Sequence, residues 1–447
     1  MINVKTIDND IMQFYKTPAM LLQKLIRFNT TNPPGNEAEC VLFIKSLLDA
    51  AGIDTLLLEN TPGRPNLIAR INGEGYSSPL LLYGHVDVVT VENQKWMHPP
   101  FEGVIEDGNV WGRGALDMKG AIAMMVASLI GLKMENITPR GDIILAVLSD
   151  EETFGRHGAG FIVEKHSALL KGVKYAIGEF GAFTMHVGGK KFYPIMIAEK
   201  QICTIKATFT GSGGHGSMKV NDSAMEKAGR FMTTIQQKKL PVHITQPAKQ
   251  MIGSMACHLP FPQKIILSGL LNRSLADIVI KMLGHSGNTF YPLLRNTVNA
   301  TIIKGGSKFN VVPSEVEIYL DGRLLPGYYP ENVLMELKDI TGNDAAFEVV
   351  EYSHGPDNID MGLFNKLEEI IKEQEPEGIP IPLMIPGVTD ARYFSQLGIQ
   401  TYGFTPMILP KGLHFNEIIH GANERIPVEA VEFGTRAISS LLKKFGA

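Results

Sequence analysis

The chain has 447 residues, of which 44% are hydrophobic and 20% are charged, and its formal net charge at pH 7 is −4. These values are typical of a globular protein with a large buried core. The lack of a net positive charge argues against nucleic acid as the main partner. Cys40, Cys203 and Cys257 are far apart in the sequence, so we expect buried thiols rather than disulfides or a thiolate metal site.

Two features of the sequence bear on targeting and membrane insertion. Met1 to Tyr15 mixes polar and acidic residues and has no basic segment followed by an apolar run, so we expect no signal peptide. No apolar stretch reaches the ~18 residues that a membrane span needs. We therefore expect a cytoplasmic protein with no membrane partner.

The first part of the chain alternates helical and extended patterns. Apolar spacing predicts helices over 18–27, 38–51 and 118–133, and strands over 66–70, 79–83 and 142–148. The strand candidates at 79–83 and 142–148 are almost continuously apolar, which is typical of strands covered on both faces. This order predicts an α/β core with helices on both faces of a sheet.

The middle of the chain has a different order of elements. We expect strands over 201–210, 297–303, 316–320 and 347–351, and helices over 223–237 and 331–340. That β-α-β-β-α-β order predicts a ferredoxin-like α+β unit inserted into the core. Within it, Leu240 to Tyr291 is a long apolar stretch that could form extra helices, a partner surface or a wall for a hydrophobic substrate. From about His354 the α/β pattern returns.

Five short segments carry side chains that can bind metal ions: GHVD (84–87), GRGALDMKG (112–120), SDEET (149–153), IGEF (177–180) and HGANER (420–425). Each alone has a structural alternative, such as a loop histidine, an N-cap aspartate or a solvated acidic turn. Three adjacent acids after a buried strand are nevertheless costly unless a positive charge lies nearby. Together the histidines and carboxylates favour Zn²⁺, Mn²⁺ or Co²⁺, and a pair of such ions can promote hydrolysis.

The order of eight motifs resembles the M20 metallopeptidase family over nearly the whole chain. The motifs are GHVDVV (84–89), WGRGALDMKG (111–120), DEE (150–152), GE (178–179), GGHGS (213–217), NVVP (310–313), GVTDAR (387–392) and HGANERI (420–426). The family includes glutamate carboxypeptidases, aminoacylases, acetylornithine deacetylase and succinyl-diaminopimelate desuccinylase. The resemblance implies a zinc-peptidase-like catalytic domain, formed by 1–197 and 354–447, and a lid or dimerisation domain at 198–353. The long lid is similar to that of the carboxypeptidase S-like branch.

The resemblance also implies a ligand set for two divalent ions, which we expect to be zinc, with cobalt or manganese as alternatives. Asp117 bridges the two ions, His85 and Glu179 complete the site of one, and Glu152 and His420 complete the site of the other. His414 also precedes an Asn-Glu pair, but the spacing of His420 matches the family motif.

Further roles follow from the same resemblance. Glu151 is the general base that activates the attacking water, and Asp87 orients His85. The peptide bond between Asp117 and Met118 is cis. His215 of a homodimer partner stabilises the oxyanion of the tetrahedral intermediate, with the lid domain forming the dimer contact.

Three residues are candidates for binding substrate. Arg392 and Arg323 could each hold a carboxylate through paired hydrogen bonds, although Arg323 could instead be structural. Asn310 could line the lid side of the site or be a turn residue.

We predict hydrolysis of an amide bond next to a free carboxylate, as in a carboxypeptidase or dipeptidase. The motifs leave open an N-acyl-amino-acid deacylase, so the expected substrate is a small peptide or an N-acyl amino acid. A binding protein on a decayed hydrolase scaffold is disfavoured because every ligand and the base are present. A two-metal phosphoesterase is disfavoured by the arginines and the lid motifs.

Overall fold

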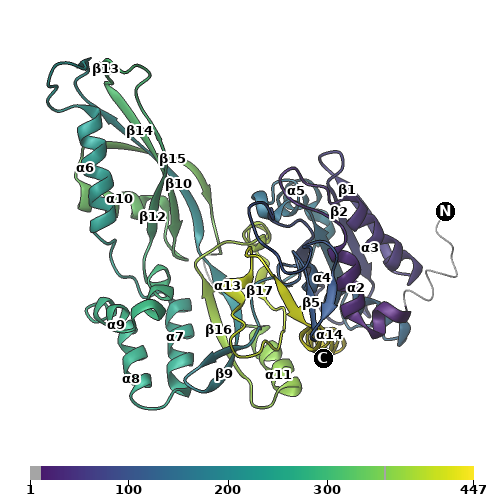
Figure 1. The fold of residues 1–447 in the computed structure, drawn as a ribbon. Helices are drawn as coiled ribbons and strands as arrows, with labels where there is room; N and C mark the ends of the chain where they lie inside the picture. Colours follow the sequence, from purple (N-terminus) through teal and green to yellow (C-terminus); the bar gives the residue numbers. More distant parts are fainter. Residues whose placement is uncertain (1–11, 357–358, 447) are drawn as a thin grey trace. The chain divides into compact units, whose positions relative to one another are not determined.

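The computed structural model describes residues 12–356 and 359–446. The expectation of no signal peptide concerns Met1 to Tyr15, which lies mostly outside these residues. The chain forms two compact units, which can be followed separately in Figure 1. Unit 1 comprises Met1–Ile197, Ile359–Leu383 and Thr389–Ala447, and unit 2 comprises Ala198–Asn358 and Met384–Val388.

The large sheet of unit 1 has nine strands in the order β1-β2-β6-β3-β7-β17-β9-β16, with β8 paired to β9. The strands are β1 (Asp54–Glu59), β2 (Pro65–Ile71), β3 (Leu80–His85), β6 (Ile143–Leu148), β7 (Tyr175–Gly178), β8 (Met185–Val187), β9 (Lys190–Glu199), β16 (Ile379–Ile385) and β17 (Gln400–Gly403). Strands β6, β3, β7 and β17 run parallel to one another, whereas β2 is antiparallel to β6 and β9 is antiparallel to β17. Every residue of β3 and β6 is buried, as their continuous apolar runs predict.

The helices of unit 1 are α2 (Pro18–Ile26), α3 (Ala38–Ala50), α4 (Lys119–Met134), α5 (Ala159–His166), α11 (Phe364–Gln374), α12 (Ala391–Ser395), α13 (Phe415–Ile418) and α14 (Val428–Lys444). Helix α4 is buried from Lys119 to Leu132 and packs against α2 and α14. A small sheet joins β18 (Arg425–Pro427), β5 (Asn109–Trp111) and β4 (Val104–Glu106). Because β5 and β18 flank motifs of the predicted site, their pairing brings residues near 112 and 424 together.

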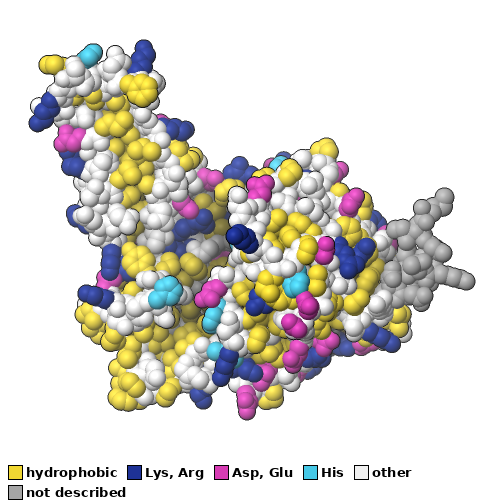
Figure 2. Space-filling view, viewed as in Figure 1, with side chains coloured by type: hydrophobic (Ala, Val, Ile, Leu, Met, Phe, Trp, Pro, Cys, Tyr) yellow, Lys and Arg dark blue, Asp and Glu magenta, His cyan; other side chains and the backbone are white. Residues whose placement is uncertain are grey.

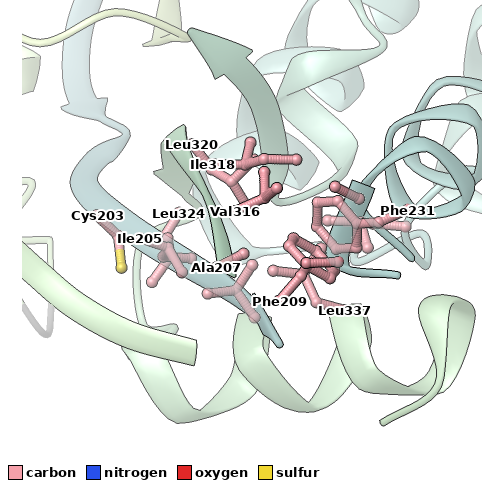
Figure 3. Packing of buried hydrophobic residues seen from close by; sticks show 14 residues of the cluster. Cys203, Ile205, Ala207, Phe209, Phe231, Val316, Ile318, Leu320, Leu324 and Leu337 are labelled. Atoms are coloured by element: carbon pink, nitrogen blue, oxygen red, sulfur yellow. The ribbon is translucent and has the colours of Figure 1, made fainter. Parts of the chain in front are cut away.

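Unit 2 contains a four-stranded antiparallel sheet in the order β12-β14-β10-β15. Its elements are β10 (Gln201–Thr210), α6 (Ala224–Gln237), β12 (Thr297–Lys304), β14 (Glu315–Leu324), α10 (Pro330–Thr341) and β15 (Ala345–Ser353). Side chains from both helices, including Phe231 and Leu337, pack on alternate residues of the strands (Figure 3). This strand order is that of a ferredoxin-like unit, and the predicted fold class is confirmed.

The apolar stretch between Leu240 and Tyr291 forms extra helices, which was one of the three predicted alternatives. They are α7 (Gln246–His258), α8 (Gln263–Ser268) and α9 (Ala276–Met282); the short 3₁₀ turn η3 (Gly269–Leu271) lies between α8 and α9, and η4 (Gly284–Thr289) follows α9. Of the helices in the described residues, none has the length and apolar character to cross a bilayer.

The cysteines follow the expectation only in part. All three are free, and Cys40 and Cys203 are buried. Cys257 is exposed, because it lies near the end of α7 on the side away from the buried residues of that helix. The prediction that it is buried was therefore wrong.

Candidate metal centre

Three of the predicted segments meet at the carboxyl end of the large sheet. His85 is the last residue of β3, Glu151 and Glu152 form a 3₁₀ turn just after β6, and Glu179 directly follows β7. These strands are parallel neighbours, so their carboxyl ends lie side by side. The crevice at this end of an open α/β sheet is the usual place for a ligand.

Asp117 lies at the centre of this group, between two histidines. Its Oδ1 is 3.2 Å from His85 Nε2, and its Oδ2 is 3.1 Å from His420 Nε2. The preceding glycine-rich loop and the start of α4 hold it in place, and the Asp117–Met118 peptide bond is cis, as predicted. One carboxylate therefore faces both imidazoles with a different oxygen each.

The remaining predicted ligands divide between the two histidines. Glu179 Oε2 is 3.6 Å from His85 Nε2, and Glu152 Oε2 is 3.4 Å from His420 Nε2. Ligand atoms of His85, Asp117 and Glu179 all lie within 4.8 Å of one another, as do those of Asp117, Glu152 and His420. The structure thus brings the five residues together as two groups of three that share Asp117.

Glu151 lies beside the first of these groups. Its Oε2 is 4.0 Å from His85 Nε2, and 14% of its side chain is exposed. Its neighbour Glu152 points to His420 instead, so the two adjacent glutamates serve different parts of the site. Glu151 is placed where a base could reach a water held among the ligands.

Asp87 supports the site in more ways than the sequence predicted. His85 Nδ1 lies 2.9 Å from the backbone oxygen of Asp87 and 3.4 Å from its Oδ1. The two carboxylate oxygens also accept hydrogen bonds from the backbone amides of Glu151, at 3.2 Å, and Glu152, at 3.1 Å. Asp87 therefore positions a histidine and the turn that carries both glutamates.

Asn32 was not singled out from the sequence, yet it contacts this support directly. Its amide nitrogen donates to Asp87 Oδ2 at 2.8 Å and to Thr153 Oγ1 at 2.9 Å. The same nitrogen lies 3.4 Å from Asp150 Oδ1. That oxygen forms an ion pair with Arg64, whose Nη1 is 2.9 Å away. In the sequence, Asn32 stands in the Asn-Pro-Pro-Gly segment after the first helix. That segment indicated only a turn, so Asn32 was not predicted to support the site.

Glu424 holds the other side of the site. Its Oε1 accepts hydrogen bonds from the amides of Leu116, at 2.8 Å, and Asp117, at 3.1 Å, and its Oε2 pairs with Arg113 Nη1 at 2.7 Å. Arg113 Nη2 also donates to the backbone oxygen of His420. This buried pair ties the loop of Asp117 to the loop of His420.

The electrostatics of the group show a surplus of buried negative charge. Burial raises the pKa of Glu152 to about 7 and raises the pKa of Glu151 well above its ordinary value, with repulsion from Glu179 adding to the second shift. Hydrogen bonds to Asp117 and Glu152 raise the pKa of His420 to about 10. The raised pKa values mean that Glu151, Glu152 and His420 tend to keep their protons. Crowded, buried carboxylates have this effect when no cation compensates their charge.

Two atoms indicate how that charge would be supplied. Glu152 Oε1 and Glu179 Oε1 are buried and have no hydrogen-bond partner within residues 12–356 and 359–446. Buried carboxylate oxygens without a partner are costly unless a cation lies against them. Because the donor set of imidazole nitrogens and carboxylate oxygens also suits zinc, manganese or cobalt, the residues fit a pair of divalent ions.

Gly178 shows how tightly Glu179 is positioned. A methyl group at Gly178 would come within 2.1 Å of the ring of Tyr83, which is on the neighbouring strand β3. The strand can therefore approach β3 closely only because residue 178 has no side chain.

The predicted substrate arginines make other contacts in this structure. Arg392 is buried, and its Nη2 donates to the backbone oxygen of Phe154 at 2.7 Å. Arg323 in unit 2 pairs with Asp321, its Nε lying 2.7 Å from Oδ1. Their roles toward a substrate carboxylate remain predictions.

Asp390 is a further residue that the sequence reading missed. Both of its carboxylate oxygens are buried without a hydrogen-bond partner in the described part of the chain, and burial raises its pKa well above the ordinary range. The charge of Arg392 acts in the opposite direction. Asp390 belongs to the GVTDAR motif (387–392), but only Arg392 of that motif was predicted to have a role in the site.

His215 and Asn310 lie together in unit 2. Strands β11 (Gly214–His215) and β13 (Val311–Val312) pair as a short ribbon, and the backbone oxygen of Asn310 accepts a hydrogen bond from Gly216. His215 is exposed, and its Nδ1 lies 2.8 Å from Ser217 Oγ and 3.3 Å from the backbone nitrogen of Ser217.

The chain is similar to several known proteins. A model of the family described as "Peptidase family M20/M25/M40" matches residues 81–444. The N-fatty-acyl-amino acid synthase/hydrolase PM20D1 of Bos taurus is 30% identical over 371 residues, which cover 79% of this chain and 71% of the relative. A probable carboxypeptidase S-like 2 of Dictyostelium discoideum is 27% identical, over 78% of this chain and 68% of that protein.

A solved structure has a similar fold. The M20 family metallo-carboxypeptidase Sso-CP2 from Sulfolobus solfataricus aligns with a TM-score of 0.66 and 19% identity, covering 96% of this chain and 99% of the other. At this identity the likeness shows that the two folds match.

Proposed function

Because the chain belongs to peptidase family M20/M25/M40 and is a hydrolase of amide bonds, we propose that it uses two divalent ions to cleave an amide bond next to a free carboxylate. The observation that carries this proposal is the double group around Asp117, in which each carboxylate oxygen faces a different histidine. Two such half-sites with one shared ligand are the arrangement that a pair of ions requires.

The residues divide between the two ions as follows. His85 and Glu179 would hold one, Glu152 and His420 would hold the other, and Asp117 would contact both. When bound, the ions would polarise the scissile carbonyl and make a water more acidic. Zinc is the metal we expect, since the set contains imidazoles as well as carboxylates.

Glu151 carries the proton in this proposal. Its carboxylate takes a proton from the attacking water and later gives it to the leaving amine. The backbone amide of Glu151 is held by Asp87, so the carboxylate starts from a fixed place near His85.

For the substrate we propose an N-acyl amino acid, which is cleaved to a carboxylic acid and a free amino acid. The support is the 30% identical relative, whose name gives N-fatty-acyl-amino acid hydrolysis. A carboxypeptidase or dipeptidase is the second candidate, which the carboxypeptidase S-like relative favours. Arg392 or Arg323 would bind the free carboxylate in either case.

We also propose a homodimer formed through unit 2, in which His215 Nε2 of one copy donates to the oxyanion formed in the other. Strand β12 is at the edge of the sheet, and its residues Ile302 and Ile303 are exposed. An exposed apolar edge strand is suited to pairing with another chain. Light scattering on the wild type and on Ile303→Lys tests this, with a monomeric variant as the expected result.

One experiment tests the proposed function and separates the two substrates. The purified chain is stripped of metal, reloaded with zinc, cobalt or manganese, and assayed for amine release from dipeptides and from N-acyl amino acids of increasing chain length. We expect about two ions per chain and metal-dependent release from the N-acyl amino acids. Release from peptides alone would favour the carboxypeptidase, and no metal-dependent release from any amide would contradict both.

A further inference from the structure

Helix α9 in unit 2 has apolar side chains on both of its faces. Its inner side buries Ala276, Val279 and Ile280. On the outer side Ile278 is 62% exposed and Met282 is 59% exposed. These two residues are one helical turn apart, so they form an apolar stripe that faces away from the core. An ordinary surface helix has polar residues there.

A second apolar pair lies next to α9 in the sequence, at the start of α8. Phe261, just before α8, is 77% exposed, and Ile265, in the first turn of α8, is 62% exposed. Figure 2 shows hydrophobic side chains gathered over α8 and α9 at the lower left, with Lys and Arg side chains near them. We call Phe261, Ile265, Ile278 and Met282 the α8–α9 face.

The charges around the α8–α9 face are mostly positive. From Leu240 to Tyr291 the chain has four basic residues and one acidic residue, although the whole protein has a net charge of −4. The basic residues are Lys249, Lys264, Arg273 and Lys281, and all are exposed. The acidic residue, Asp277, is paired with Lys239 at 2.8 Å and with Arg295 at 2.7 Å, so its charge is compensated locally.

A hollow of about 670 Å³ opens beside the stripe of α9. Its lining combines apolar side chains with two lysines and one carboxylate. The residues that line it include Ile278, Ile280, Tyr291, Lys239, Lys281 and Asp277. Such a hollow suits a molecule with an apolar part and an anionic part, and it would let the end of a lipid chain or headgroup settle against the helix.

We propose that the α8–α9 face is a peripheral docking surface for a bilayer that contains anionic lipids. The apolar side chains enter the interface, while Lys264 and Lys281 lie at the level of the headgroups. This combination of an exposed apolar stripe and neighbouring basic side chains is how interfacial helices bind acidic membranes. Large exposed apolar patches mark protein–protein or membrane interaction sites, and the neighbouring basic side chains favour an anionic membrane. The contact needs no spanning segment, and it differs from the expectation of no membrane partner.

Vesicle flotation with the full chain tests the proposal. The purified protein is mixed with vesicles of phosphatidylcholine and phosphatidylglycerol, or of phosphatidylcholine alone, at low and high salt. The test variant is Ile278→Glu with Met282→Glu. The matched control is Met335→Glu, because Met335 is a methionine of unit 2 that is 60% exposed on α10. Circular dichroism and hydrolysis of a soluble substrate check that each variant is folded.

We expect the wild type and Met335→Glu to float with the anionic vesicles, and to float less at high salt because the charges are screened. The double variant should lose roughly tenfold or more in vesicle affinity. A second variant, Lys264→Glu with Lys281→Glu, should lose binding to anionic vesicles as well.

Absence of wild-type flotation, or flotation that neither variant changes, would overturn the proposal. The same holds if the wild type floats equally with neutral vesicles. If the double variant instead changes the oligomeric mass of a chain that binds no vesicles, the face is a contact between copies. Flotation is measured without turnover, so its failure is distinct from failure of the proposed activity.

Discussion

The side-chain amide of Asn32 donates a 2.8 Å hydrogen bond to Asp87 Oδ2. The same oxygen accepts a hydrogen bond from the backbone amide of Glu152. Asp87 Oδ1 accepts the amide of Glu151. A residue near the N-terminus therefore stabilises the carboxylate that orients a predicted ligand and the predicted base.

Replacing Asn32 by Ala should impair catalysis without unfolding the protein. Asp87 would lose its only side-chain amide donor among the described residues and could rotate away from the turn of Glu151 and Glu152. We expect kcat to fall by about 10–100-fold, as is common when a residue that supports metal ligands is removed. The exposed Asn365 of α11 offers a matched control, Asn365→Ala, which should leave kcat unchanged. A kcat for Asn32→Ala within twofold of the wild type would contradict this role.

Replacing Glu151 by Gln should separate metal binding from turnover. The amide keeps the size of the side chain but cannot take a proton, so kcat should fall by about 10²–10⁴-fold or more while the metal content stays at the wild-type level. Glu164→Gln on the exposed surface of α5 is the control. Elemental analysis and single-turnover assays measure the two properties, and an active Glu151→Gln enzyme would rule out the proposed base.

Replacing Glu424 by Ala should destabilise the fold and the metal site together. Arg113 is 1% exposed, so the change leaves a buried guanidinium without its carboxylate and removes the acceptor of the Asp117 amide. Removal of one partner of a buried ion pair costs about 3–5 kcal/mol of the free energy of unfolding. Glu424→Gln keeps one acceptor oxygen and should cost less. Denaturant unfolding of the metal-free proteins gives the comparison, and equal losses for the two variants would contradict it.

Lys200 in unit 2 should make stability depend on pH. Its ammonium group donates to the backbone oxygen of Arg295 and to Thr297 Oγ1, but burial, aided by the charge of Arg323, lowers its pKa to about 7. In the unfolded chain the pKa returns to about 10.5, so between these values the unfolded state binds more protons. The free energy of unfolding should therefore rise as the pH increases from 7 toward 10.

The matched variant for this effect is Lys200→Met, which keeps the apolar stem and removes the titrating group. Since one pKa unit corresponds to about 1.4 kcal/mol, the wild type should gain a few kcal/mol relative to the variant across that range. Denaturant titrations at pH 7 and at higher pH measure the difference. A constant difference between the two proteins would show that Lys200 keeps an ordinary pKa.

Local patterns predicted most of the fold. The helix at 118–133 and the strands at 79–83, 142–148 and 201–210 are confirmed, with ends that shift by a few residues at most. Strand β1 was missed, because Asp54–Glu59 is an edge strand with several exposed residues and lacks the continuous apolar run that marks β3 and β6. The strand order of unit 2 follows from its element order, since a β-α-β-β-α-β chain has few ways to form one sheet.

The site was only partly accessible from the sequence. Residues such as His85 and Asp117 stand in motifs whose order is specific, and the structure brings them together. Asn32 and Glu424 act through contacts with residues 55 and about 300 positions away, which no local pattern encodes. A partner surface was one alternative for Leu240 to Tyr291, but an apolar helix gives no sign of which of its sides the neighbouring elements leave uncovered.

The close approach at Gly178 limits how this sequence can diverge. Any side chain at position 178 would collide with Tyr83 and would push the strand that carries Glu179 away from β3. Related sequences that keep Glu179 must therefore also keep Gly178, unless a smaller residue replaces Tyr83 first. We expect positions 83 and 178 to change together or not at all. Mutational scanning should find position 178 as intolerant as the predicted ligands, although a glycine has no side chain with which to bind a metal.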